Sequence, residues 1–277
     1  MIPFNFIYCR PDTIGEAYEA FFRLWAEGKN PAYYSGGSET ITMCRAGNIQ
    51  PGAVIDLKSI PECSLVFADQ DGLSIGAACT LNQIKESNLF PLLSLACGRI
   101  ADHTNQCRIT LGGNLCGTII YRETSLALLL SDASLTLLGE DGSRTVPFEH
   151  VFQGRMQLSP GELVVRAHIP GWALTAPHYH IKHTANEKID YPLVSMAAIR
   201  KDGRLRAAFS GVCSYPFRSA EMEDILNDRA LSHSARAEQA AVRLPEPARS
   251  DVEGSGAYRK FVLTNMLRAL FEEFKDG

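Results

Sequence analysis

The stretch ITLGGNLCGT, residues 109–118, places two adjacent glycines after the short run Ile-Thr-Leu. A similar pair occurs earlier, in YYSGGSET at residues 33–40, where Ser38 and Glu39 follow the glycines at once. Glycine lets backbone N–H groups approach a ligand without a Cβ in the way. Successive N–H groups then form a concave surface that binds anions. The two stretches therefore indicate either two unrelated tight turns or two loops that clamp a diphosphate from two sides.

The chain of 277 residues is long enough for one large domain or two modest ones, and 45% of its residues are hydrophobic. Its net charge is −4 and it contains no basic run, which disfavours nucleic acid or an anionic membrane as a partner. No apolar stretch reaches the length of a membrane span. Because the first residues do not resemble a signal peptide, we expect a cytoplasmic protein.

The eight cysteines are scattered, and no pair has C-x-x-C spacing, so the sequence predicts reduced thiols and no zinc or iron–sulfur site. His178, His180 and His183 include an H-x-H spacing, but no cysteine or carboxylate stands at ligand spacing. We therefore expect no metal in this chain. If the protein carries electrons, the carrier is a group that it binds.

Helix and strand patterns alternate irregularly, which predicts an α+β fold. No G-x-G-x-x-G follows the first strand and no G-x-x-x-x-G-K-[ST] is present, which disfavours a Rossmann site and excludes a P-loop. Pro170, Gly171 and Pro177 indicate a domain boundary near 172–178. The expected elements in the first part of the chain are a helix from Thr13 to Gly28, strands at 32–34 and 54–57, a strand and a helix within 72–84, and a helix within 90–101. Further along, we expect a buried segment at 124–133, two strands within 134–148 joined by Gly-Glu-Asp-Gly, a strand at 162–170, three strands within 178–218, and helices near 219–242 and 254–274.

Four stretches occur in one order along almost the whole chain: the first glycine stretch, TLGGNL (110–115), RTVPFEHVFQGRMQLSPGELVVRAHIP (144–170) and DVEGSGAYRKFVLTNMLRALF (251–271). Together they resemble the FAD-binding medium subunit of the molybdenum hydroxylases, the xanthine dehydrogenase family. The resemblance implies an FAD-binding domain at 1–172 of the vanillyl-alcohol-oxidase-like type, with two α+β subdomains at about 1–58 and 59–172. A smaller α+β C-terminal domain, 175–277, is implied to follow.

The resemblance also implies roles for individual residues. The first stretch would wrap the FAD diphosphate and the second would contact it from the other side. Glu123 stands where the family has an aspartate that bonds the cofactor's hydroxyl groups, and Val164 matches an apolar position against the flavin. Lys182 and the nearby Asp190 match residues close to the flavin ring, where the lysine would favour an anionic reduced flavin. The implied cofactor residues are Tyr34, Ser35, Gly36, Gly37, Ser38, Glu39, Thr110, Gly113, Asn114, Glu123, Val164 and Lys182.

The function that the resemblance implies is electron transfer by non-covalent FAD in a complex most similar to xanthine dehydrogenase. A large partner chain would hold the molybdenum cofactor, and a small one would hold two iron–sulfur clusters, in a dimer of heterotrimers. Electrons would pass through FAD to NAD, and we assign no catalytic acid or base to this chain. The chain departs from many members at 115–122, LCGTIIYR, where they have a small, proline-containing segment.

Three alternatives stay open at this point. One is the flavin subunit of a carbon monoxide, nicotinate or aldehyde dehydrogenase relative. Another is a nucleotide-binding regulatory or assembly module without electron transfer. The last is a stand-alone flavin oxidase or reductase, such as the UDP-N-acetyl-enolpyruvylglucosamine reductase type. Bound flavin would argue against the assembly module, and turnover by the isolated chain would favour the stand-alone enzyme.

Overall fold

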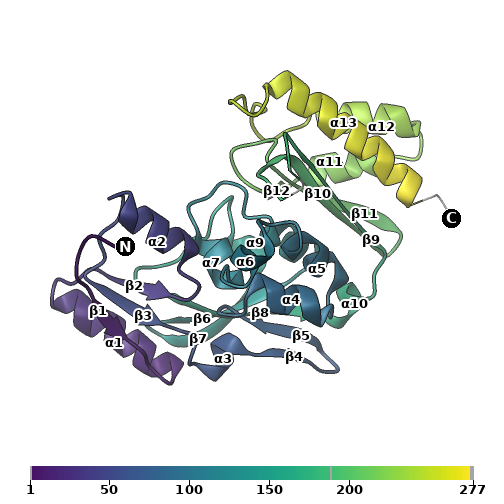
Figure 1. Cartoon of the computed structure of the whole chain (residues 1–277). Helices are drawn as coiled ribbons and strands as arrows, with labels where there is room; N and C mark the ends of the chain where they lie inside the picture. The colour runs from purple at the N-terminus through teal and green to yellow at the C-terminus, as the bar shows by residue number, and fades with distance from the viewer. Residues whose placement is uncertain (1, 188, 275–277) are drawn as a thin grey trace.

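The computed structural model describes residues 2–187 and 189–274, which form three β-sheets with helices packed against them (Figure 1). The first sheet is parallel, in the order β1 (Ile7–Cys9), β3 (Ala53–Asp56), β2 (Pro31–Tyr34). The second is antiparallel, in the order β4 (Val66–Ala68), β5 (Gly72–Gly76), β8 (Leu163–Pro170), β6 (Ser134–Gly139), β7 (Gly142–Pro147). The third is also antiparallel, in the order β12 (Phe217–Arg218), β11 (Arg204–Ser210), β10 (Pro192–Lys201), β9 (His178–Thr184). The predicted α+β class is confirmed.

The helices of the first part of the chain connect and cover the first two sheets (Figure 1). They are α1 (Ile14–Ala26), α2 (Ser38–Arg45), α3 (Pro61–Ser64), α4 (Leu81–Ser87), α5 (Pro91–Cys97), α6 (His103–Gln106), α7 (Leu111–Cys116), α8 (Thr124–Leu130), α9 (Phe148–Val151) and α10 (Gly171–Leu174). Three more, α11 (Ala220–Leu226), α12 (His233–Ala241) and α13 (Gly256–Glu273), cover one face of the third sheet. Within the described residues, no helix is both long and apolar enough to cross a membrane.

The first helix begins where the sequence predicts it. Thr13 caps α1 by accepting a hydrogen bond from the Glu16 N–H at 3.1 Å, and the Glu16 carboxylate accepts one from the Asp12 N–H at 2.9 Å. These bonds satisfy N–H groups that a helix start leaves without partners. Local side-chain chemistry is therefore sufficient to start α1.

One predicted helix, 219–242, is wrong because the structure has two helices there, α11 and α12. The Asn227 side chain binds β11 instead, accepting from the Leu205 N–H at 2.9 Å and donating to the Leu205 carbonyl at 2.8 Å. Ser232 then caps the new helix through the N–H of Ala235. Hydrogen bonds to β11, which is distant in sequence, thus end α11. The hydrophobic periodicity of 219–242 does not predict these bonds.

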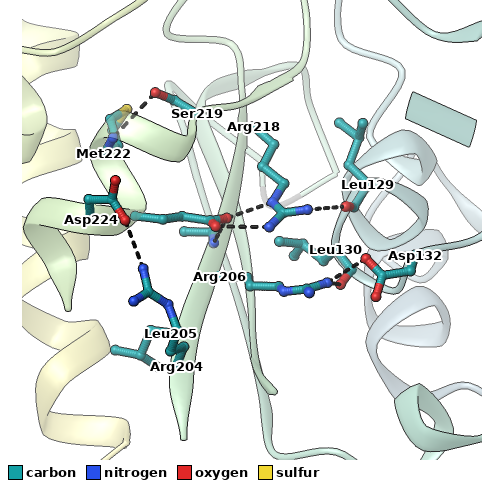
Figure 2. Close-up of polar contacts among 12 residues, drawn as sticks. Leu129, Leu130, Asp132, Arg204, Leu205, Arg206, Arg218, Ser219, Met222 and Asp224 are labelled. Atoms are coloured by element: carbon teal, nitrogen blue, oxygen red, sulfur yellow. Dashed lines mark hydrogen bonds and ion pairs between the residues drawn. The ribbon is translucent and has the colours of Figure 1, made fainter. Parts of the chain in front are cut away.

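Helix α8 is buried along its whole length, since all seven of its residues are buried. Its C-terminal end is held by two arginines of the third sheet (Figure 2). Arg218 donates to the Leu129 carbonyl at 3.3 Å, and Arg206 donates to the Leu130 carbonyl at 3.2 Å and to Asp132 at 2.6 Å. Cations at a helix C-terminus satisfy free carbonyls and favour the helix dipole.

The third sheet also contributes apolar residues to the main core. Ala197, Ile199 and Ala208 pack in the same cluster as the side chains of α8. Its opposite face, with residues such as Met196 and Phe209, packs against α11–α13. The division into domains at 172–175, with subdomains that meet near 58–59, stays a prediction.

Candidate cofactor site

The two glycine stretches lie against each other. A Cβ added to Gly36 would lie 1.7 Å from the carbonyl oxygen of Arg108, so only glycine permits this contact. Glu39, two residues after the glycine pair, accepts hydrogen bonds from the Thr118 N–H at 2.7 Å and from its hydroxyl at 2.6 Å. Residues 79 positions apart are therefore joined directly.

The first glycine stretch ends at an uncapped helix start. Gly37 is the N-cap of α2, with a φ of 70°, and no side chain caps the helix. Within the described residues, the N–H groups of Ser38, Glu39 and Thr40 donate to no protein acceptor. Free N–H groups and the positive end of the helix dipole favour an anion. This arrangement fits a diphosphate.

A polar cluster formed by Lys58, Asp56 and Tyr8 contacts the first glycine stretch. Lys58 donates to the Ser35 carbonyl at 2.9 Å and to Asp56 at 2.7 Å, and its ammonium lies 4.8 Å from the centre of the Tyr34 ring. Tyr8 donates to Asp56 at 2.6 Å. Burial tends to raise the pKa of Asp56, but the hydrogen bonds from Lys58 and Tyr8 outweigh it and lower that pKa. The charge of Lys58 is thus neutralised by Asp56.

The second glycine stretch is a helix rather than the open loop that the glycines suggest. Thr110 caps α7 by accepting from the Gly113 N–H at 3.2 Å. The N–H groups of Leu111 and Gly112 donate to carbonyls within 77–79, at 2.9 and 2.8 Å. Most of the donors expected to face a diphosphate are therefore used inside the protein. A Cβ on Gly113 would meet only the Thr110 hydroxyl, at 2.9 Å, so Gly113 still offers a close approach from that side.

Asn114 connects α7 to α8. Its side-chain oxygen accepts from the Thr124 hydroxyl at 2.6 Å, and both residues are buried. Val164 lies in the main apolar core with Leu111 and Leu115 of α7. The structure therefore gives Asn114 and Val164 packing roles; contacts of either one with a flavin stay a prediction.

Glu123 and Lys182 form a buried ion pair at the start of α8. Their side chains are 4% and 1% exposed, and Lys182 Nζ lies 2.9 Å from Glu123 Oε2. Lys182 also donates to the Arg99 carbonyl at 2.7 Å. Burial raises the pKa of the Glu123 carboxyl, while Lys182 opposes this shift. Glu123 Oε1 is buried and makes no hydrogen bond within the described residues, although the Ser195 hydroxyl is near enough to favour the ionised carboxylate. This oxygen is an acceptor that a ligand hydroxyl suits.

The histidines near Lys182 give no sign of a metal site. His180 is 7% exposed, and burial, followed by repulsion from Arg99 and Lys182, lowers its pKa to about 3. Its ring is therefore neutral at ordinary pH. Across 2–187 and 189–274, no group of three or more potential metal ligands is present. Asp190 closes a turn by accepting from the Glu187 N–H at 3.0 Å.

The unusual segment before Glu123 lies close to the first glycine stretch. Tyr121 stacks on Tyr191 with ring centroids 4.8 Å apart, and Arg249 lies over the Tyr121 ring at 5.8 Å. Burial raises the pKa of the Tyr191 hydroxyl, and Tyr121 and the negative charge of Glu39 add to this shift. The sequence showed that this segment departs from many family members, but it did not predict the stack of Tyr121 on Tyr191.

Comparisons with known proteins identify the family. Residues 3–172 match the family model described as "FAD binding domain in molybdopterin dehydrogenase". The chain is 27% identical to the glyceraldehyde dehydrogenase medium chain of Sulfolobus acidocaldarius, over 99% of each chain. It is 26% identical to the carbon monoxide dehydrogenase medium chain of Hydrogenophaga pseudoflava, over 97% of this chain and 96% of that one.

The solved structures agree in fold. A carbon monoxide dehydrogenase chain from Hydrogenophaga pseudoflava, 26% identical, superimposes with a TM-score of 0.86 over 97% of this chain and 96% of that chain. Quinoline 2-oxidoreductase from Pseudomonas putida 86 gives the same score at 22% identity, over 99% of this chain and 97% of that one, which shows the shared fold. Because the family model covers more than half of the chain, the protein belongs to the family of FAD-binding domains of molybdopterin dehydrogenases.

Proposed function

We propose that this chain is the FAD-carrying electron-transfer subunit of a multi-subunit molybdenum hydroxylase. The observation that carries the proposal is the uncapped start of α2 at Gly37, which the second glycine stretch meets directly. FAD supplies the electron and hydride chemistry, and the protein supplies binding and electrostatics. The family match over residues 3–172 supports FAD as the group that this site holds.

The residues of this chain would then have distinct tasks. The N–H groups of Ser38 and Glu39 would bind the diphosphate, since the helix start leaves them free. The Glu39 carboxylate, fixed by Thr118, would accept from a hydroxyl of the cofactor. The free oxygen of Glu123 would accept from another. We assign no proton transfer to any of them.

The partners and the substrate belong to the same proposal. The relatives are named as chains of glyceraldehyde, carbon monoxide and 6-hydroxypseudooxynicotine dehydrogenases, at 26–28% identity. These names favour an aldehyde-, carbon monoxide- or heterocycle-oxidising complex over the xanthine dehydrogenase type that the sequence resemblance put first. A large chain would hold the molybdenum cofactor, a small chain the iron–sulfur clusters, and NAD would accept the electrons.

Purification with and without the two partner chains tests the proposal. The isolated chain should carry about one FAD, and denaturation should release all of it, since the binding is non-covalent. Stopped-flow absorbance should show flavin bleaching by NADH in the isolated chain. Bleaching by an aldehyde, carbon monoxide or a heterocycle should require both partners.

The outcomes separate the alternatives. FMN in place of FAD, or no flavin after titration with FAD, would contradict the diphosphate site. Bleaching by an oxidisable substrate without partners would indicate a stand-alone enzyme and end the electron-relay proposal. A chain that binds FAD but never transfers electrons, alone or in the complex, would contradict the electron-transfer role. Bleaching by the substrate in the complex but never by NADH would exclude NAD as the acceptor.

A further inference from the structure

Arg122 is a buried cation beside the two glycine stretches. Its side chain lies under the surface, with the residue 6% exposed. One terminal nitrogen donates to the Gly117 carbonyl at 3.0 Å and the other to the Gly154 carbonyl. Its Nε is buried and has no partner within the described part of the chain. Arg122 thus reaches the end of α7, whose first turn carries Gly113.

Among the residues that the structure describes, no carboxylate neutralises Arg122 by direct contact, because both of its bonded partners are carbonyl groups. The two lysines of the site differ from Arg122, since Lys58 contacts Asp56 and Lys182 contacts Glu123. Among the described charged groups, Glu39 attracts Arg122 from a distance and the exposed Arg155 repels it.

The backbone at Arg122 is also unusual. Its φ is 27°, a region that side chains with a Cβ rarely adopt. Its guanidinium lies 5.9 Å from the centre of the Phe152 ring, which contributes a further attraction to the cation. The protein therefore holds a permanent positive charge in a restricted place at the cost of an uncommon backbone conformation.

We propose that Arg122 is the counter-charge for the diphosphate of the cofactor. The inference rests on the proposed function, because it takes FAD as the ligand. Glu39 is fixed at the junction of the two glycine stretches and would repel a diphosphate. A buried cation close by offsets that repulsion, since charges interact strongly where water is excluded. Neither Lys58 nor Lys182 is free to do so.

Two variants separate charge from structure. Arg122→Met removes the charge, and Arg122→Lys keeps it while losing the paired bonds to the two carbonyls. The affinity of the flavin-free chain for FAD and for riboflavin, which lacks phosphate, is measured by fluorescence titration at low and high salt. We expect Arg122→Met to weaken FAD binding by about tenfold or more and riboflavin binding by less than about twofold. Arg122→Lys should bind FAD within about threefold of the parent.

The result that overturns the inference is equally definite. Equal weakening for FAD and riboflavin, or an Arg122→Lys chain no better than Arg122→Met, would show that Arg122 only joins two carbonyl groups. An Arg122→Met chain that binds FAD like the parent would also end it. If Arg122→Met does not fold, as judged by circular dichroism, Arg122→Gln keeps an amide donor without the charge. A parent chain without affinity for FAD would overturn the proposed function itself.

Discussion

Glu123 and Lys182 are 2.9 Å apart although 59 residues separate them, and both side chains are almost fully buried. Glu123 immediately precedes α8, and Lys182 lies on β9 of the third sheet. At the other end of α8, Arg206 and Arg218 of the same sheet bind its last carbonyls. The third sheet therefore fixes both ends of a buried helix of the FAD-binding part.

Breaking this ion pair should be costly. Lys182→Met leaves the Glu123 carboxylate buried without a cation, and such a loss costs about 3–5 kcal/mol of the free energy of unfolding. The double variant Lys182→Met/Glu123→Leu should recover most of this, because no buried charge remains. Urea denaturation measures the free energy of unfolding of the single variant and of the double variant.

A surface ion pair is the control for that experiment. Arg204 and Asp224 are 2.7 Å apart with side chains 62% and 74% exposed. Arg204→Met should change the free energy of unfolding by only about 0–1 kcal/mol. Equal effects of Lys182→Met and Arg204→Met would mean that the buried pair does not hold α8.

Asp132 should make the stability of the protein depend on acid pH. Burial tends to raise its pKa, but hydrogen bonds from Lys201 and Arg206 outweigh burial and hold the pKa below its ordinary value of 3.8. The unfolded chain then binds the proton at a higher pH than the folded protein does. The stabilisation is therefore present above pH 3.8 and is lost as the pH falls through the folded pKa.

Asp132→Asn tests this dependence without altering the backbone, because asparagine tolerates the positive φ of 54° at this position. The parent should be more stable than Asp132→Asn at pH 6, and the difference should shrink in urea titrations between pH 4 and 2.5. A difference that does not vary with pH would show that the carboxylate charge is not involved.

Gly113→Val should abolish FAD binding while leaving the fold intact. The added Cβ would meet the Thr110 hydroxyl at 2.9 Å, and its two methyl groups would occupy the side from which the diphosphate approaches. Gly15→Val is a matched control, because Gly15 also follows a threonine cap and its Cβ would lie 4.0 Å from the Thr13 hydroxyl. A Gly113→Val chain that binds FAD like Gly15→Val would show that α7 only packs.

Asn114 and Thr124 should be energetically coupled. Asn114→Ala leaves the fully buried Thr124 hydroxyl without its acceptor, which costs about 1–3 kcal/mol. Thr124→Val removes the hydroxyl and the need for that acceptor. A double-mutant cycle in urea should give a coupling energy between about 0.5 and 3 kcal/mol, and purely additive effects would contradict a bond between α7 and α8.

Local chemistry accounts for the elements that the sequence predicted well. The helix after Thr13 and the β6–β7 hairpin, with its glycine turn, depend on neighbouring residues. The helices at the two glycine stretches were missed, because paired glycines in a sequence are typical of turns. Contacts with distant residues, such as that of Gly36 with Arg108, are not visible in the sequence.

In the candidate site, too, the sequence shows local chemistry but not the contacts between distant residues. The glycine pairs and the Glu39 carboxylate are visible in the sequence because their chemistry is local. The partner of Glu39 is Thr118, 79 residues away, and the partner of Glu123 lies 59 residues away. Neither pair has a signal in spacing or periodicity, because each exists only when separate elements pack together. Arg122 lies in the segment 115–122, which departs from many family members, but its contacts with the carbonyls of Gly117 and Gly154 required the structure.

The contacts that hold the two ends of α8 come from residues that lie later in the chain. The family match ends at residue 172, yet Lys182, Arg206 and Arg218, which hold both ends of α8, are translated later. In a chain that ends at residue 172, the two ends of the apolar helix α8 would lack these contacts. The ends of α8 therefore gain these contacts only when the chain up to residue 218 is present, so the part that the family model matches relies on later strands to hold a buried helix.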